Sequence, residues 1–213
     1  MRVERAFGFV DLCGFTEFTD RHDDASVVVV LASLRTALRE AAARRGVRVV
    51  KWLGDGAMLS STMPDALVAL AIEIDIRMSV EAPPLPVRIG LAHGPVIMFE
   101  GDDYIGRAVN LAARLCDRAE PHDVLAAGDM ATCGPPWVTN RSVGTTEVRG
   151  FRDPLEVWSL GLAPSDRPDA EPVVDPVCGL AIPRAMAIAG EDGASYCSPA
   201  CAEAERVSVV SRP

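Results

Sequence analysis

The order of apolar patterns along residues 1–162 constrains the fold of this chain more than any other feature. A short apolar run at Arg5–Leu12 fits a buried strand, and apolar residues at helical spacing across Asp24–Arg45 predict a helix. The remaining expected elements are strands at Val47–Leu53 and Ala57–Ser60, a helix at Pro64–Ser79, a strand pair at Val87–Ala92 and Val96–Phe99, a helix at Ala108–Ala119, and strands near Asp123–Ala126, Thr145–Val148 and Leu155–Leu160. This order predicts an α/β (α+β) domain with antiparallel strand pairing and helices on one face of the sheet.

The composition changes at Ala163 and divides the chain into three parts. Residues 163–172 are rich in proline and charge and hold almost nothing that could be buried, which indicates a linker. We therefore expect a large domain at 1–162, a linker at 163–172 and a small module at 173–213. The small module holds three of the six cysteines.

Charge and hydropathy exclude several classes of partner. The net charge is −9 and no basic tract stands out, which argues against polymeric nucleic acid. The longest apolar run, near Val27–Leu34, falls far short of the roughly 20 residues that span a bilayer. The N-terminal residues lack a signal-peptide pattern, so we expect a cytoplasmic protein with no membrane partner. Cysteines in that compartment are free thiols or metal ligands more often than disulfides.

Two aspartates stand where apolar strands end. Asp11 follows the first strand, and Asp55 lies between Gly54 and Gly56 in a predicted hairpin turn. Carboxylates at strand ends suit Mg²⁺, and neighbouring glycines let the backbone approach a ligand closely. Either aspartate taken singly is more often an ordinary turn residue.

Three longer motifs change the weight of these aspartates. They are Phe-Val-Asp-Leu-Cys-Gly-Phe-Thr at 9–16, Lys-Trp-Leu-Gly-Asp-Gly at 51–56, and Asp-Tyr-Ile-Gly-Arg-Ala-Val-Asn-Leu-Ala-Ala-Arg at 103–114. In this order and spacing, the chain from about residue 4 to 161 resembles the catalytic domain of class III adenylate and guanylate cyclases. The resemblance implies the ferredoxin-like core of that family.

The resemblance assigns a metal-binding role to the first two motifs. Asp11 and Asp55, helped by the carbonyl of Leu12, would bind two Mg²⁺ or Mn²⁺ ions per site. The ions would activate the ribose 3′-hydroxyl of ATP and stabilise charge as its oxygen attacks the α-phosphorus and pyrophosphate leaves. The backbone amides expected to hold the phosphates belong to Gly14, Phe15 and Thr16.

The same resemblance assigns Lys51 and Asp103 to the purine. A lysine satisfies the acceptor N1 of adenine and a carboxylate satisfies its 6-amino donor, whereas guanine presents the opposite pattern. Lys51 is also the only lysine among 21 basic residues. Its compact ammonium is not interchangeable with a broad guanidinium, so this exception favours a functional role.

The third motif is expected to act on the ribose and phosphates. By resemblance Asn110 would orient the ribose, Arg114 would stabilise phosphate charge, and Arg149 would face the triphosphate. Family members build two such sites at the interface of a homodimer. The sequence thus indicates an adenylate cyclase; a non-catalytic nucleotide-binding signalling module and a guanylate cyclase are the alternatives.

The C-terminal module carries a cysteine motif of its own. Cys178, Cys197 and Cys201 follow the spacing Cys-x₁₈-Cys-x₃-Cys, and the segment resembles a YHS domain. Three thiolates suit Zn²⁺ or a soft metal such as Cu⁺, with Asp175 a candidate fourth ligand. Such a module could regulate the cyclase; the alternative is a metal-free module that merely packs on it.

Overall fold

The centre of the molecule is an eight-stranded sheet in the order β2-β3-β1-β4-β6-β8-β7, with β5 paired to β4. This computed structural model describes residues 1–80, 85–100, 103–164, 171–191 and 193–210. The strands of the sheet are β1 (Arg2–Leu12), β2 (Arg48–Leu53), β3 (Gly56–Ser61), β4 (Val87–Phe99), β5 (Asp103–Ile105), β6 (Val124–Ala127), β7 (Val138–Thr146) and β8 (Leu155–Leu162). The helices are α1 (Phe15–Arg21), α2 (Asp24–Arg45), α3 (Pro64–Val80), α4 (Arg107–Arg118) and α5 (Pro199–Val210), and short 3₁₀ turns occur at Gly128–Thr132 and Arg184–Met186.

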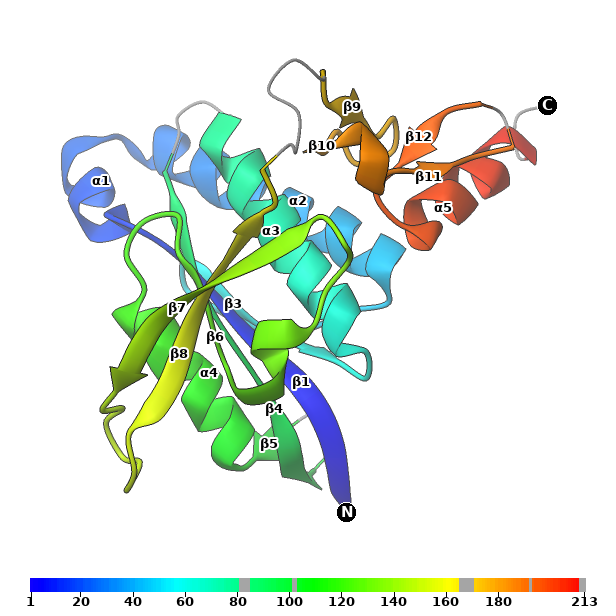
Figure 1. Cartoon of the computed structure of the whole chain (residues 1–213). Coiled ribbons are helices and arrows are strands. Elements are labelled where there is room, and N and C mark those ends of the chain that lie inside the picture. Colours follow the sequence, from blue (N-terminus) through cyan, green and yellow to red (C-terminus); the bar gives the residue numbers. More distant parts are fainter. Residues whose placement is uncertain (81–84, 101–102, 165–170, 192, 211–213) are drawn as a thin grey trace.

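The mixed α/β architecture is confirmed, but the expectation that helices cover one face only is wrong. Successive residues of β1 point to opposite faces. Val10 belongs to the core formed with α2 and α3, whereas Phe7 packs with Leu111 and Leu115 of α4. Figure 1 shows α2 and α3 on one side of the sheet and α4 on the other. The central strands are apolar on both faces, so both faces need a cover.

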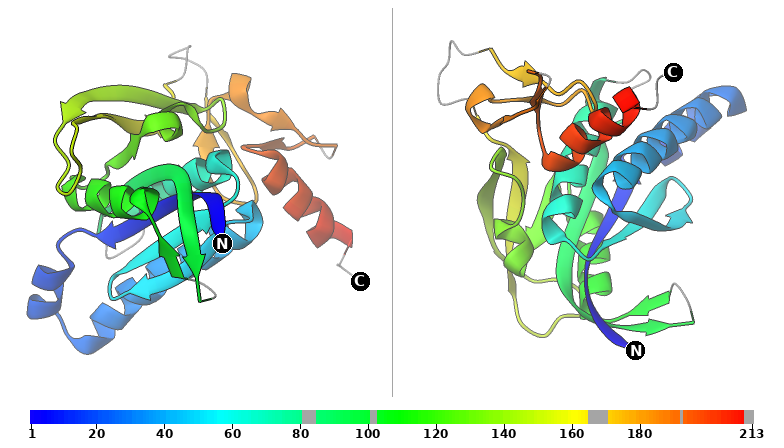
Figure 2. Two further views of the ribbon diagram at one scale, coloured as in Figure 1. Left: turned by 90° about the horizontal axis from the view of Figure 1, so that it is seen from below. Right: turned by 90° about the vertical axis from the view of Figure 1, so that its right-hand side faces the viewer.

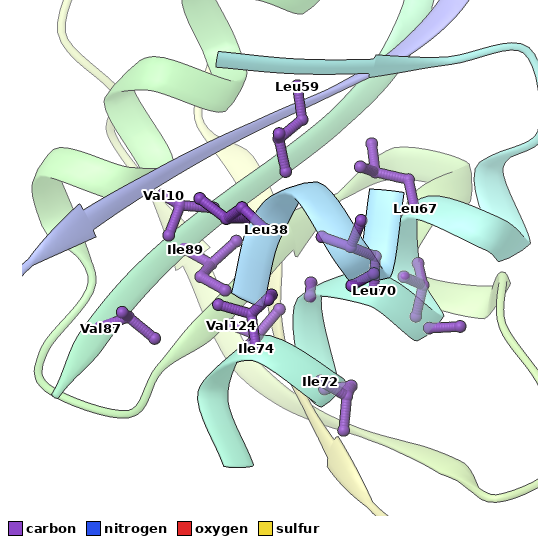
Figure 3. Packing of buried hydrophobic residues seen from close by; sticks show 14 of the residues in the cluster. Val10, Leu38, Leu59, Leu67, Leu70, Ile72, Ile74, Val87, Ile89 and Val124 are labelled. Atoms are coloured by element: carbon purple, nitrogen blue, oxygen red, sulfur yellow. The ribbon is translucent and has the colours of Figure 1, made fainter. Parts of the chain in front are cut away.

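The larger core lies between the sheet and helices α2 and α3. In Figure 3, Leu38 of α2 and Leu70 and Ile74 of α3 lie against Val10 and Ile89 of the central strands. Residues of this layer are almost fully buried, as for Leu38 and Ile89 at 0% exposure. The layer makes the sheet a rigid base for the loops at its strand ends.

Helix α2 forms despite its run of four valines. The side chain of Asp23 caps its start by accepting a hydrogen bond from the backbone N–H of Ser26 at 3.0 Å. Gly46 ends it in the left-handed conformation, with φ of 63°. Val30 is buried and Val28 and Val29 are exposed, so helical periodicity outweighs the local preference for strand.

Two strand predictions need correction. The expected pair at Val87–Ala92 and Val96–Phe99 is the single strand β4, whose pairing with β1 runs without a break from Val87 to Ile97. β6 and β5 pair with β4 only at its two ends, so Pro95 lies where one edge has no strand partner among the described residues. The strand expected near Thr145–Val148 is β7, which begins earlier, at Val138, and ends at Thr146.

The C-terminal segment forms a small module beside α2. It consists of the pairs β9 (Val173–Val174) with β10 (Ala181–Ile182) and β11 (Ile188–Ala189) with β12 (Ser195–Tyr196), followed by α5. Figure 2 shows α5 running next to α2. Most of the predicted linker, residues 165–170, lies outside the described residues. Within the described part of the chain, no helix combines the length and apolar character that crossing a bilayer requires.

Candidate active site

The ends of β1 and β2 bring the two predicted metal-binding aspartates together. Asp11 is the penultimate residue of β1, and Asp55 lies in the turn between β2 and β3. Gly56 makes this proximity possible. A Cβ at Gly56 would lie 2.5 Å from the carbonyl oxygen of Val10 and 3.2 Å from Oδ1 of Asp11, so any side chain would push the turn away.

A hollow of about 360 Å³ opens beside this pair of aspartates. It is lined by all the residues predicted to bind the metals and phosphates through the first two motifs: Asp11, Leu12, Gly14, Phe15, Thr16 and Asp55. The C-terminal end of α4 and the following residues 119–121 also line the hollow. The first motif and the hairpin turn therefore build one site rather than two unrelated turns.

Arg88 of β4 is a member of this site that the sequence did not reveal. It lies opposite Asp11 in the β1–β4 pairing, and its Nε and Nη2 donate to Asp11 Oδ2 at 3.0 and 2.6 Å. These hydrogen bonds raise the pKa of Arg88. Because the two residues are 77 positions apart, only the strand register brings them together.

The donor set of the hollow fits a hard divalent cation. Burial raises the pKa of the Asp55 carboxyl, and the negative charge of Asp11 adds to that rise. The guanidinium of Arg88 contacts Asp11. Two carboxylates at a strand end with a backbone carbonyl beside them are the oxygen ligands that Mg²⁺ and Mn²⁺ prefer.

The two predicted base-reading residues lie against each other. The Nζ of Lys51 in β2 pairs with Oδ1 of Asp103, the first residue of β5. About half of each side chain remains exposed, 46% for Lys51 and 53% for Asp103. The described residues that line the Asp11 hollow include neither of them. The pair forms a separate polar site on the surface.

Helix α4 carries the third group of predicted residues. Asn110 and Arg114 are exposed one turn apart, and Arg114 donates to Oδ2 of Asp117 at 2.9 Å. Arg114 and Arg149 line a second hollow of about 370 Å³, so these two predicted phosphate ligands do lie together.

Gly90 of β4 fixes how closely α4 lies on the sheet. A Cβ there would be 2.2 Å from both the carbonyl oxygen of Ala112 and the amide nitrogen of Cys116. The backbone of α4 therefore rests directly on the strand that carries Arg88. This close approach sets the height of Asn110 and Arg114 above the sheet.

The three cysteines of the C-terminal module form a cluster. The Sγ atom of Cys197 lies 3.6 Å from the Sγ atoms of Cys178 and Cys201. Ligand atoms of these cysteines and of Asp175 all lie within 4.8 Å of one another. Asp175 also organises the loop, since its carboxylate accepts hydrogen bonds from the backbone N–H groups of Val177, Cys178 and Cys197.

Arg45 joins this cluster to the large domain. Its guanidinium pairs with the buried Glu73 of α3 at 2.8 Å and also donates to Ser198 Oγ and Cys197 Sγ at 3.4 Å. Hydrogen bonding with the thiols of Cys178 and Cys201, together with the charge of Arg45, lowers the pKa of the Cys197 thiol. The cluster thus places the Cys197 sulfur beside a guanidinium and two further sulfur ligands.

Comparison with known proteins identifies the large domain. Residues 5–161 match the family of adenylate and guanylate cyclase catalytic domains. The chain belongs to this family. The match covers all the residues predicted for the cyclase site, from Asp11 to Arg149.

The chain spans less than half the length of the curated relatives that it matches. The chain is 35% identical over 158 residues to an uncharacterized protein of Mycobacterium tuberculosis, a match to 74% of this chain and 41% of that protein. It is 32% identical over 120 residues to an adenylate cyclase of Streptomyces coelicolor, a match to 56% of this chain and 31% of that enzyme. The chain therefore corresponds to less than half of each of these relatives.

Solved structures share the fold. The guanylate cyclase domain from Catenaria anguillulae in complex with GTP matches with a TM-score of 0.69 at 20% identity, over 77% of this chain and all of that domain. The adenylyl cyclase CyaB from P. aeruginosa matches with a TM-score of 0.62 at 23% identity, over 79% of this chain and 97% of that one. Both nucleotide specificities occur on this fold, so base choice must be argued from the residues of this chain.

Proposed function

We propose that this chain is an adenylate cyclase that converts ATP to 3′,5′-cyclic AMP and pyrophosphate at the interface of a homodimer. The observation that carries the choice of ATP is the contact between Lys51 and Asp103. An ammonium and a carboxylate held side by side match the N1 acceptor and the 6-amino donor of adenine. Guanine would place its N1–H against the ammonium and its O6 against the carboxylate, leaving both polar groups unpaired.

The hollow at Asp11 is the proposed site of phosphoryl chemistry. Asp11, Asp55 and the carbonyl of Leu12 would hold two Mg²⁺ or Mn²⁺ ions, which lower the pKa of the ribose 3′-hydroxyl and neutralise charge on the phosphates. The 3′-oxygen gives its proton to water and bonds to the α-phosphorus, while the bond to the β-phosphate oxygen breaks and pyrophosphate leaves.

The chain's own residues position the triphosphate. Arg88 already contacts Asp11 and lines the hollow, so it can turn from the carboxylate to the phosphates once cations neutralise Asp11. Gly14, Phe15 and Thr16, which could offer backbone amides, line the same hollow. In this arrangement Arg88 replaces one charge partner with another at little cost.

Separation of the polar groups within one chain supports a shared site. The Asp11 hollow holds the metal ligands, whereas Lys51 and Asp103 lie outside it and Asn110 and Arg114 project from α4. We propose that a partner chain supplies the base-reading pair together with Asn110, Arg114 and Arg149 across a two-fold axis. Each dimer would then contain two equivalent sites.

The decisive experiment incubates purified chain with ATP and Mn²⁺ or Mg²⁺ and measures cyclic AMP, with GTP as competitor. We expect cyclic AMP formation, abolished in Asp11→Ala and little affected by equimolar GTP. ATP binding without product at concentrations that dimerise the chain would instead support the non-catalytic signalling module. Faster formation of cyclic GMP would support the guanylate cyclase.

A specific observation also favours metal binding by the C-terminal module. Two sulfurs on a tetrahedral Zn²⁺ with Zn–S bonds of about 2.3 Å would be about 3.8 Å apart. The observed spacing of 3.6 Å in the Cys178, Cys197 and Cys201 cluster is close to that value. We propose that these thiolates, with Asp175, bind Zn²⁺ or another thiophilic metal and that the YHS-like module regulates the cyclase.

Metal analysis of the purified chain tests this second proposal. We expect about one thiophilic metal ion per chain, lost in Cys178→Ser. A matched control is Cys133→Ser, because Cys133 is a free cysteine outside the cluster. Equal metal content in the two variants would contradict the assignment.

A further inference from the structure

A cavity of about 730 Å³ lies where the C-terminal module meets the large domain. Its walls come from the end of α2, the start of α3, residues 134–136 and the module on the opposite side. Figures 1 and 2 show the module seated over these helices. Cavities of this size at the junction of two structural units are a common location for small-molecule sites.

Most of the cavity wall is apolar, and methionine and proline side chains form part of it. Met63 immediately precedes α3, Met186 belongs to the module, and Pro135 and Pro136 also line the cavity. Thioethers make favourable contacts with aromatic rings, and proline rings offer flat apolar surfaces. The wall therefore favours an aromatic body over a strongly polar one.

Two arginines that line the cavity, Arg44 and Arg45, differ in how many of their N–H groups have hydrogen-bond partners. Arg45 is fully engaged, with contacts to Glu73, Ser198 and Cys197. Arg44 contacts Glu73 through Nη2, but its Nε is buried and has no hydrogen-bond partner among the residues that the structure describes. Arg44 lines the cavity and 14% of its side chain is exposed, so an acceptor that enters from the cavity can reach the outer edge of its guanidinium.

The charges around Arg44 favour an anionic acceptor. Arg44 and Arg45 share the single carboxylate of Glu73. Arg77 lies 3.9 Å from the same carboxylate but pairs with Glu40 at 2.9 Å. Asp65, the acidic residue of the wall, already accepts a hydrogen bond from the backbone N–H of Gly134. A hydrogen bond from a guanidinium to a carboxylate is stronger than one to a neutral oxygen.

We propose that this cavity binds a small aromatic carboxylate, with the carboxylate accepting a hydrogen bond from the exposed edge of the Arg44 guanidinium and the ring lying against the methionine and proline side chains. The ligand would contact the cyclase helices and the module at once. Its binding therefore stabilises the seat of the module on the large domain. The proposal is separate from cyclase chemistry, and the cavity adjoins the proposed metal site because Cys197 also lines it.

Isothermal titration calorimetry on the full chain tests the proposal with a matched pair of probes, 2-naphthaleneacetate and the neutral 2-naphthaleneethanol. We expect the carboxylate to bind about tenfold more tightly than the alcohol, the size of effect that one charge-assisted hydrogen bond gives. Arg44→Met should remove that preference. Arg39→Met, an exposed position on the same helix, should retain it.

A second variant tests the cavity without touching the arginines. Ala66→Phe, on the α3 wall, fills space and should weaken both probes about tenfold or more. This result decides the matter even if Arg44→Met fails to fold. Absence of binding, equal affinity for the two probes, or unchanged binding in Ala66→Phe would each overturn the proposal. Calorimetry reports binding whether or not the chain makes cyclic AMP, so the two proposals fail independently.

Discussion

Lys51 is the residue at which base choice can be tested most directly. In Lys51→Glu a carboxylate replaces the donor to adenine N1, so we expect kcat/KM for ATP to fall by about 10²- to 10⁴-fold. Combining it with Asp103→Asn places an amide donor where guanine O6 would lie. Initial rates of the double variant with both nucleotides should then favour GTP.

The control for this change is a charge reversal of equal size away from the pair. Arg21 lies on α1 with 70% of its side chain exposed, and Arg21→Glu should leave the ratio of ATP to GTP turnover unchanged. A Lys51→Glu enzyme that retained wild-type preference for ATP would show that Lys51 does not read the base.

At the residue scale, the sequence predicted the members of the site better than their contacts. Asp11, Asp55 and the phosphate turn were predicted from short motifs, and the structure does bring them to one hollow. Arg88 was missed because it stands in an ordinary apolar strand pattern. Its proximity to Asp11 follows from the register of β1 and β4, which no local pattern encodes.

At the element scale, α4 depends on a single glycine of β4. In Gly90→Ala the new Cβ meets backbone atoms of α4 at 2.2 Å, and backbone cannot move aside as a flexible side chain can. We expect a loss of about 1–3 kcal/mol in the free energy of unfolding. Cyclase activity should fall by more than the loss of folded protein alone would explain, because Asn110 and Arg114 move with the helix.

Urea unfolding and cyclase assays at a temperature where both variants are folded check this expectation. Gly161→Ala in β8 is the matched control, because a Cβ there meets no atom within 4 Å. Stability of Gly90→Ala equal to that of Gly161→Ala would contradict the role given to this contact.

The elements also show where local patterns mislead. The pattern at 93–95 resembled a turn because glycine and proline interrupt it, but pairing with β1 on one side carries β4 straight through. The expectation of helices on one face only was wrong, because the order of elements along the chain does not determine which face of the sheet each helix covers. Periodicity did predict α2 closely, because its apolar residues recur at helical spacing along the helix.

At the scale of the whole molecule, the docking of the C-terminal module links its cysteine cluster to the cyclase core. Arg45, Glu73 and Cys197 meet although they are far apart in sequence, which is why composition revealed the linker but not the interface. Trp137 adds a further tie, since its Nε1 donates to the carbonyl oxygen of Cys197 at 2.6 Å. Metal binding at the cysteines should therefore change the stability of the large domain.

Zinc-dependent unfolding tests this linkage. Zn²⁺ at about 100 times its dissociation constant should add about 2.7 kcal/mol to the stability of the folded chain, because it binds the folded cluster preferentially. Thermal unfolding of the large domain, followed by circular dichroism, should shift upward with Zn²⁺ in the wild type and in Cys133→Ser but not in Cys197→Ser. A shift of equal size in both variants would place the stabilising metal elsewhere.

The shared-site dimer makes a quantitative prediction about mixtures of inactive chains. Asp55→Ala disables the metal half of a site, and Arg114→Ala disables the half that the partner is proposed to supply. Mixing equal amounts should place half of the chains in mixed dimers, each with one intact site and one doubly damaged site. Activity should thus recover to about one quarter of wild type, measured as cyclic AMP per chain after subunit exchange.

Each variant alone should stay inactive. Mixing two different metal-half variants, Asp55→Ala with Asp11→Ala, should restore no activity, because the metal-binding half of every site is then damaged. Recovery in that control mixture, or none in the first, would mean that each chain builds its site alone.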